Sequence, residues 1–262
     1  MQIYSRGPKR GHFGRSRSLE DFNKRFSPEL LQKIIKTALN TKGKVKVLEI
    51  GCGEGRVLME LRKLFPQIEL YGINKEPWPA MKGQESLRRT GTFYKIFRKD
   101  EINAIKLPKI YFYDATKIRF KDNYFDVIYS QTSIPYFERK DKLIEEIYRI
   151  LKVGGKALLH IDSFENYYPD FMRQDAPRFI IYGKGKLLNL PEFFRKFRKY
   201  GIDVELRIQK NAKKTYMEIV KKKNIMLNLG LKFDETSSFR LINIVKGAHS
   251  DIFWGYRSVY RI

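Results

Sequence analysis

The first residues able to do chemistry are three glycines that directly follow an apolar run. Residues 47–50 are mostly apolar, and Gly51, Gly53 and Gly55 then stand at alternate positions before a helical pattern begins. Glycine has no Cβ, so the chain can turn tightly there and a ligand can lie against bare backbone. The N–H groups that open the next helix point toward such a ligand. A strand-to-helix turn of this kind indicates binding of a nucleotide or a similar cofactor.

An acidic residue and a series of later segments extend this motif. Glu49 stands inside the end of the strand, and the spacing is Gly-x-Gly-x-Gly rather than the dinucleotide Gly-x-Gly-x-x-Gly. The later segments are expected strands at 68–74, 110–115 and 120–131, then a helix, a Gly-Gly turn and a fifth strand from 143 onward. In this order, across roughly residues 45–163 and more weakly to about 222, they resemble the class I S-adenosylmethionine (SAM) methyltransferases.

The resemblance implies a Rossmann-like, seven-stranded α/β fold with SAM as the cofactor. Strands that alternate with helices predict a parallel, doubly wound sheet in their own right, and ligands of such sheets lie beyond the carboxyl ends of the strands. The resemblance also implies roles for the residues at those ends. Near the methionine part of SAM these are Glu49, Gly51, Gly53 and Gly55; near the adenine, Asp114 and Ala115; beneath the sulfonium, Ser130 and Gln131.

One position departs from the family pattern. The second strand usually ends in an acid that accepts both ribose hydroxyls, whereas this chain has Asn74. An amide has one acceptor oxygen and no charge, which predicts binding weaker by about 1–3 kcal/mol. Asn74→Asp is therefore expected to tighten SAM binding. Two alternatives are that Glu76 accepts the ribose hydroxyls instead, or that SAM binding has been lost.

Three residues near strand ends are candidates for the methyl-transfer step. Methyl transfer is an in-line displacement that depends on positioning, and it needs a general base only if the nucleophile carries a proton. Asp162 follows the expected fifth strand, Tyr136 could cap the methyl site, and His160 is a possible base or a core histidine. We identify no motif for methylation of the exocyclic nitrogens of nucleic-acid bases or of pyrimidine carbon, and no metal site.

Net charge is the second strong signal. The 262 residues include 53 Lys and Arg against 29 Asp and Glu, a formal charge of +24. Such an excess indicates a polyanionic partner, which could be RNA, DNA or an anionic membrane, and we take RNA as the main prediction; a lysine-rich solvated surface is the alternative. Residues 1–18 contain five basic residues and no acid, which predicts an arm that lies on phosphates or, alternatively, a mitochondrial transit peptide. The expected helix 190–200 carries a second basic face.

The chain is expected to have three parts. They are a basic flexible arm at 1–18, a methyltransferase domain at 19–222 with insertions at about 76–108 and 164–190, and a C-terminal β extension at 223–262. Alternation of apolar residues predicts an antiparallel pair of strands, 203–209 and 215–222, that closes the domain. A further pair, 239–245 and 252–260, is expected in the extension.

These observations predict a methyltransferase that acts on RNA, most plausibly ribosomal or transfer RNA. One alternative is a non-catalytic RNA-binding protein of this fold inside a ribonucleoprotein, and another is a small-molecule or protein methyltransferase. No apolar run approaches the ~20 residues of a membrane span, and no secretory signal is visible. With the single Cys52, this predicts a cytoplasmic protein, or one of the mitochondrial matrix. The oligomeric state is left open.

Overall fold

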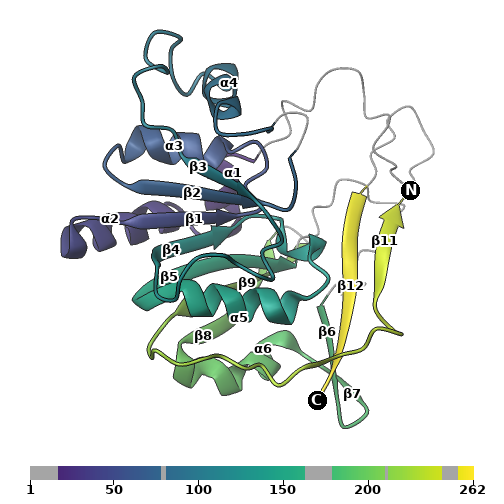
Figure 1. Ribbon diagram of the computed structural model, residues 1–262. Coiled ribbons are helices and arrows are strands. Elements are labelled where there is room, and N and C mark those ends of the chain that lie inside the picture. The colour runs from purple at the N-terminus through teal and green to yellow at the C-terminus, as the bar shows by residue number, and fades with distance from the viewer. Residues whose placement is uncertain (1–16, 78–80, 163–178, 210–211, 244–252) are drawn as a thin grey trace.

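The structure is a computed structural model that describes residues 17–77, 81–162, 179–209, 212–243 and 253–262 (Figure 1). Its centre is a seven-stranded sheet in the order β3-β2-β1-β4-β5-β9-β8. The first five strands are parallel, β9 is antiparallel to β5, and β8 is antiparallel to β9. The strands are β1 (Lys46–Ile50), β2 (Glu69–Asn74), β3 (Lys109–Phe112), β4 (Phe125–Ser130), β5 (Leu151–Asp162), β8 (Ile202–Gln209) and β9 (Ala212–Val220). This confirms the Rossmann-like expectation and the closing antiparallel pair.

Helices cover both faces of this sheet because its central strands are apolar on both sides. Along β4, Val127 and Tyr129 face one layer, whereas Phe125 and Ile128 face the other, and all four are fully buried. The first layer consists of α1 (Leu19–Arg25), α2 (Leu30–Lys42) and α3 (Arg56–Leu64), with α4 (Ser86–Phe93) beside α3. The second consists of α5 (Lys140–Ile150) and α6 (Leu190–Phe194), which continues as the 3-10 helix η2 (Arg195–Tyr200).

Helix α1 was not expected from the sequence. Ser18 caps it: its Oγ accepts from the Asp21 N–H (3.0 Å), and the Asp21 carboxylate accepts from the Ser18 N–H (2.9 Å). The rings of Phe22 and of Phe26, just after the helix, stack with their centres 4.1 Å apart, and both side chains are fully buried. Of the predicted arm, only Arg17 and Ser18 belong to the described residues, and Ser18 is part of the folded domain.

A second, smaller sheet joins two segments that lie far apart in the sequence. Its strands are β6 (Phe179–Gly183), β7 (Lys186–Leu188), β10 (Lys232–Phe233), β11 (Phe239–Asn243) and β12 (Phe253–Arg261). The order is β10-β12-β6-β7, and β11 pairs with β12. The antiparallel β11–β12 pair confirms the strands expected in the extension. Because β12 is parallel to β6, the C-terminal segment and the second insertion form one structural unit.

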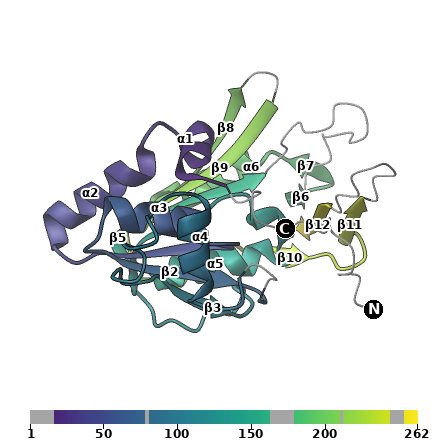
Figure 2. The same ribbon diagram turned by 90° about the horizontal axis from the view of Figure 1, so that it is seen from above.

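Buried polar contacts hold this second sheet against the start of α5. Lys140 is fully buried, and its Nζ donates to the Phe137 carbonyl (2.7 Å), the Tyr256 carbonyl (2.9 Å) and Ser258 Oγ (2.7 Å). The Tyr260 hydroxyl donates to Asp141 (3.1 Å). Figure 2 shows the second sheet to one side of the seven-stranded sheet. In the described part of the chain, no helix is long and apolar enough to cross a membrane.

Candidate active site

The three glycines after β1 have left-handed φ values but different surroundings. Their φ angles are 70°, 54° and 74° for Gly51, Gly53 and Gly55. A Cβ on Gly51 would lie 2.3 Å from the Cβ of Ser133, and one on Gly55 would lie 2.4 Å from a methyl of Leu87. A Cβ on Gly53 would meet nothing within 4 Å. Two glycines therefore allow close packing, and Gly53 alone of the three borders open space that a cofactor can fill.

The start of α3 supplies hydrogen-bond donors beside this space. Gly55 is the N-cap of the nine-residue α3, and no side chain caps the helix. The Gly55 N–H donates back to the Cys52 carbonyl (2.8 Å), which shapes the turn. The first N–H groups of a helix and the positive end of its dipole favour a carboxylate. This arrangement fits the carboxylate of the methionine part of SAM.

Asn74 is tied to the glycine turn by two hydrogen bonds. Its Oδ1 accepts from the Gly53 N–H (2.9 Å), and its Nδ2 donates to the Gly53 carbonyl (3.0 Å). A carboxylate could accept the first of these bonds but has no hydrogen to donate in the second. The departure from the family pattern therefore has a structural role here, which the sequence did not show. Its contact with ribose stays a prediction, as does that of the exposed Glu76.

Glu49 lies beneath the turn with its carboxylate toward the α1–α3 layer. Its Oε2 accepts from the Tyr129 hydroxyl (3.0 Å), and the side chain is buried. Burial raises the pKa of Glu49 well above its ordinary value. Burial likewise raises the pKa of the neighbouring Cys52 thiol, which agrees with a spacer rather than a nucleophile.

The loop after β4 closes the site from the other side. Ser133 Oγ donates to the Ile50 carbonyl (2.8 Å), and Ser130 Oγ lies 2.5 Å from Ser133 Oγ. These contacts tie the ends of β4 and β1 together and leave Ser130 fully buried. Between them, Thr132 has a φ of 61°, an uncommon angle for a β-branched residue. Backbone of this kind is concentrated at functional sites.

Gln131 faces α1. When its amide is turned so that the oxygen faces these donors, that oxygen accepts from the Phe22 N–H (3.0 Å) and from Arg25 Nη1 (2.6 Å). The first helix therefore lies over the carboxyl end of β4, next to the loop that should meet the reactive part of a cofactor. This placement makes α1 a wall of the site.

The predicted adenine residues follow β3, beside the end of β2. The Tyr113 N–H donates to the Asn74 carbonyl (2.9 Å), which sets the two strand ends side by side. Asp114 is exposed, and its Oδ1 accepts from the Thr116 N–H (2.9 Å). Ala115 is buried against the core. The structure thus brings Asn74 and Asp114 to one edge of the sheet, together with the glycine turn.

The three catalytic candidates have different surroundings. His160 is buried on the α1 side of β5, and the centre of its ring lies 6.2 Å from that of Phe26. Tyr216 is its partner on the neighbouring strand β9. Asp162 is the last residue of β5, but its side chain lies outside the described residues. Tyr136 ends the 3-10 helix η1 (Ile134–Tyr136) and is 46% exposed. All three roles stay predictions, and that of His160 would require movement of α1.

Several residues of the site were missed by sequence reasoning. The Tyr94 hydroxyl donates to Glu54 (2.8 Å), and Thr90 Oγ1 donates to the Glu54 carbonyl (2.9 Å), so α4 holds the glycine turn from outside. Ser133 was missed as well. The Ser18-x-x-Asp21 capping box is a local signal that could have found α1. Among the described residues, no cluster of His, Cys, Asp and Glu could hold a metal ion.

Comparison with known proteins agrees with this geometry. Residues 48–159 match the family model described as "Methyltransferase domain". The chain is 32% identical over 116 residues to sterol 4-C-methyltransferase strm-1 of Caenorhabditis elegans, which covers 44% of this chain and 30% of that protein. It is 28% identical over 151 residues to demethylmenaquinone methyltransferase of Bacteroides fragilis, and this match covers 55% of this chain and 54% of that protein. The chain therefore spans at most about half the length of these two curated relatives.

Solved structures show more distant likeness. The carbon methyltransferase of CurJ has 11% sequence identity and a TM-score of 0.46, covering 72% of this chain and 52% of that one. Geranyl diphosphate C-methyltransferase from Streptomyces coelicolor has 17% identity and a TM-score of 0.33, covering 50% and 45%.

Proposed function

Because the chain belongs to the class I SAM-dependent methyltransferases, we propose that it transfers the methyl group of SAM to a small organic acceptor. The observation that carries the cofactor assignment is the open space beside Gly53 in a turn that is otherwise tightly packed. The curated relatives above are named for a sterol and for a menaquinone precursor, both small molecules. These names support a small acceptor over RNA.

The residues of the site have separable tasks in this proposal. When bound, SAM supplies a methyl group on a positively charged sulfur. The Gly53 backbone leaves room for the ligand, the N–H groups at the start of α3 attract its carboxylate, and Asn74 keeps the turn in shape. The Ser130–Ser133 pair fixes the loop after β4, whose backbone would lie near the sulfur. Catalysis then depends on alignment of acceptor and methyl group.

The acceptor side would be formed by α1 and by η1, where Tyr136 is exposed. An acceptor carbon with no proton to lose at the moment of attack needs no general base. This agrees with a site whose one histidine candidate, His160, is packed in the core. An acceptor that carries a proton would need a general base, and Tyr136 and Asp162 are the candidates for that role.

The test is a transfer assay with SAM labelled in its methyl group. The purified full chain is offered sterols, demethylated quinones and total RNA in separate reactions. We expect label in the organic extract of one small-molecule reaction and none with Gly53→Val. Label that enters only the RNA would overturn the small-acceptor proposal and retain the cofactor assignment.

RNA is the second candidate acceptor or partner, and charge favours it. The exposed side of α6 and η2 carries Arg195, Lys196, Arg198 and Lys199. One of these is neutralised, since Arg198 pairs with Asp203 (3.1 Å). An electrostatic RNA contact predicts that log affinity falls linearly with log salt, by about 0.7 to 0.9 for each phosphate bound. RNA binding without any methyl transfer would favour the non-catalytic ribonucleoprotein role.

A further inference from the structure

The second sheet has one face in the core and another that belongs to no core. Strand residues alternate between faces, and Phe179, Ile181 and Tyr260 point into the large cluster shared with α5 and α6. The neighbours Ile180 and Val259 are paired across β6 and β12, so they lie on the opposite, outer face. Both are buried, yet neither belongs to any of the three hydrophobic clusters found among the described residues.

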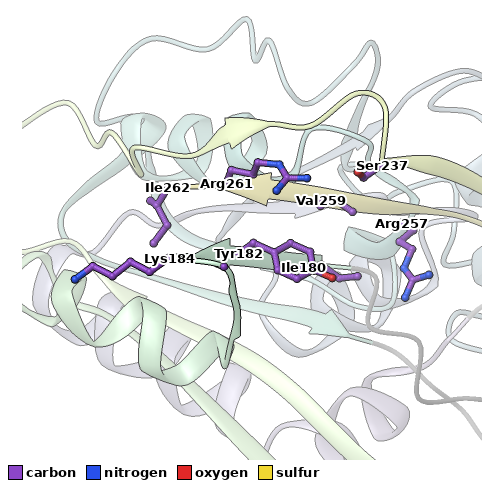
Figure 3. Close-up of a pocket in the computed structure, with 9 residues that line it drawn as sticks. Ile180, Tyr182, Lys184, Ser237, Arg257, Val259, Arg261 and Ile262 are labelled. Atoms are coloured by element: carbon purple, nitrogen blue, oxygen red, sulfur yellow. The ribbon is translucent and has the colours of Figure 1, made fainter.

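A cavity of about 480 Å³ lies on this outer face (Figure 3). Its floor is Ile180 and Val259, and Tyr182 continues it along β6. Ile262 also lines the cavity, and 53% of it is exposed. A volume of this size is typical of small-molecule sites, and exposed large apolar side chains at a hollow indicate a missing contact.

Cations surround the apolar floor. Figure 3 shows Arg257 at one end of the cavity, Lys184 at the other end with its ammonium pointing outward, and Arg261 between them. Arg261 pairs with Asp234 through Nε (2.8 Å) and Nη2 (2.7 Å), and its guanidinium lies 5.9 Å from the Tyr182 ring centre. Lys184 is exposed and makes no ion pair with any described residue. The lining therefore has a positive balance, with Ser237 as a neutral hydroxyl.

We propose that this cavity is a binding site for a small amphipathic anion, one with an apolar body and a carboxylate or phosphate group. The apolar body lies on Ile180, Val259 and Tyr182, the anionic group is held by Arg261 beside Tyr182, and Lys184 adds positive charge at one end of the lining. Neither an inorganic anion nor a neutral amphiphile satisfies both halves of the lining. The site is separate from the SAM turn, because it opens on the face of the second sheet opposite to the one packed on α5 and α6. It does not depend on the proposed function.

The test is calorimetry of the full chain with four probes below their micelle concentrations: octyl phosphate, octanoate, octyl glucoside and inorganic phosphate. We expect octyl phosphate and octanoate to bind at one site. Octyl glucoside and inorganic phosphate should bind at least about tenfold more weakly, since each lacks one half of the interaction. The proposal would be overturned if inorganic phosphate or octyl glucoside bound as tightly as octyl phosphate does. It would also be overturned if neither octyl phosphate nor octanoate bound.

Two lysines of the β6–β7 hairpin give a matched pair of variants. Lys184→Glu reverses a charge of the cavity lining, and Lys186→Glu reverses the same charge two residues away, at an exposed position outside the lining. We expect Lys184→Glu to weaken octyl phosphate binding about tenfold and Lys186→Glu to leave it nearly unchanged. Equal weakening by both would mean general attraction to a basic surface, against the proposal.

A third variant tests the apolar half. Val259→Phe fills the floor of the cavity and should abolish binding of octanoate. Binding of S-adenosylhomocysteine, measured on the same samples, reports whether each variant is folded and should be unchanged. If Val259→Phe is not folded, Tyr182→Ala replaces it and should weaken octanoate more than inorganic phosphate. Octanoate binding unaffected by the folded floor variant would contradict the assignment.

Discussion

At Gly53 the backbone φ is 54°, and a side chain would enter open space beside the turn. Gly53→Val should therefore remove binding of SAM and of S-adenosylhomocysteine, because its methyl groups would occupy the ligand's position. Gly43→Val is the matched control: Gly43 has a φ of 70° and also has nothing within 4 Å, but it lies at the end of α2. Both variants carry the strain of a left-handed side chain. Calorimetry should find the loss of binding in Gly53→Val alone.

Asn74 gives a second prediction at this scale, and it reverses the expectation from the sequence. The carboxylate of Asn74→Asp has no hydrogen for the Gly53 carbonyl and would repel it. The variant should lose about 1–3 kcal/mol of stability at neutral pH and should not bind S-adenosylhomocysteine more tightly. The loss should shrink in acid, where a protonated carboxyl can donate again. Urea unfolding at two pH values and calorimetry would check this; tighter binding would restore the ribose-acceptor interpretation.

Glu49 makes stability depend on pH. Burial raises the pKa of this carboxyl in the folded state, so between the ordinary carboxyl pKa and the raised value the folded state holds a proton that the unfolded state has released. Folding stability must then fall as pH rises, by up to about 1.4 kcal/mol per pH unit in that window. Glu49→Gln keeps an acceptor for Tyr129 and has no such titration. Its stability advantage over the wild type should grow from pH 5 to pH 8 in urea unfolding; a constant difference would contradict a buried, raised pKa.

Among the elements, α5 and β12 make a buried polar contact that helps to join the two sheets. Lys140 Nζ donates hydrogen bonds to two carbonyls and a hydroxyl. Without the ammonium group, these buried oxygens would lose this donor. Lys140→Met should therefore cost about 2–4 kcal/mol of stability. The nearby Lys142 is 52% exposed and pairs with Glu145, so Lys142→Met should change stability by less than about 0.5 kcal/mol. Similar unfolding midpoints for the two variants would show that β12 is held by other contacts.

For the whole molecule, the charge of +24 sets the behaviour with polyanions. Deletion of residues 1–16 removes Arg6, Lys9, Arg10 and Arg15 and leaves the Ser18 cap of α1 in place. The shortened chain should bind S-adenosylhomocysteine as the full chain does. Its RNA affinity should fall, and the slope of log affinity against log salt should decrease by about 0.7 to 0.9 for each phosphate that the arm no longer neutralises. An unchanged slope would exclude the arm as an RNA-binding segment.

At the scale of the whole molecule, the sequence by itself determined the features that depend on a local pattern of residues. Strands that alternate with helices predicted the parallel sheet, the glycines after residue 50 predicted the turn, and alternating apolar residues predicted the antiparallel pair that became β8 and β9. The β11–β12 pair was predicted in the same way. These features could be predicted because strand period and left-handed glycine positions depend on residues close together in the chain.

The tertiary structure decided what depends on distant partners. Asn74 and Gly53 are 21 positions apart, and only the fold shows that an amide is needed between them. Likewise, His160 is buried because Phe26, directly after α1, packs on that face of β5. Strand β12 pairs with the distant β6, and Lys140 and Tyr260 hold β12 on α5. No local pattern states which face of a strand a distant helix will cover. Packing and the need to satisfy buried polar groups decide it, and both act across the whole chain.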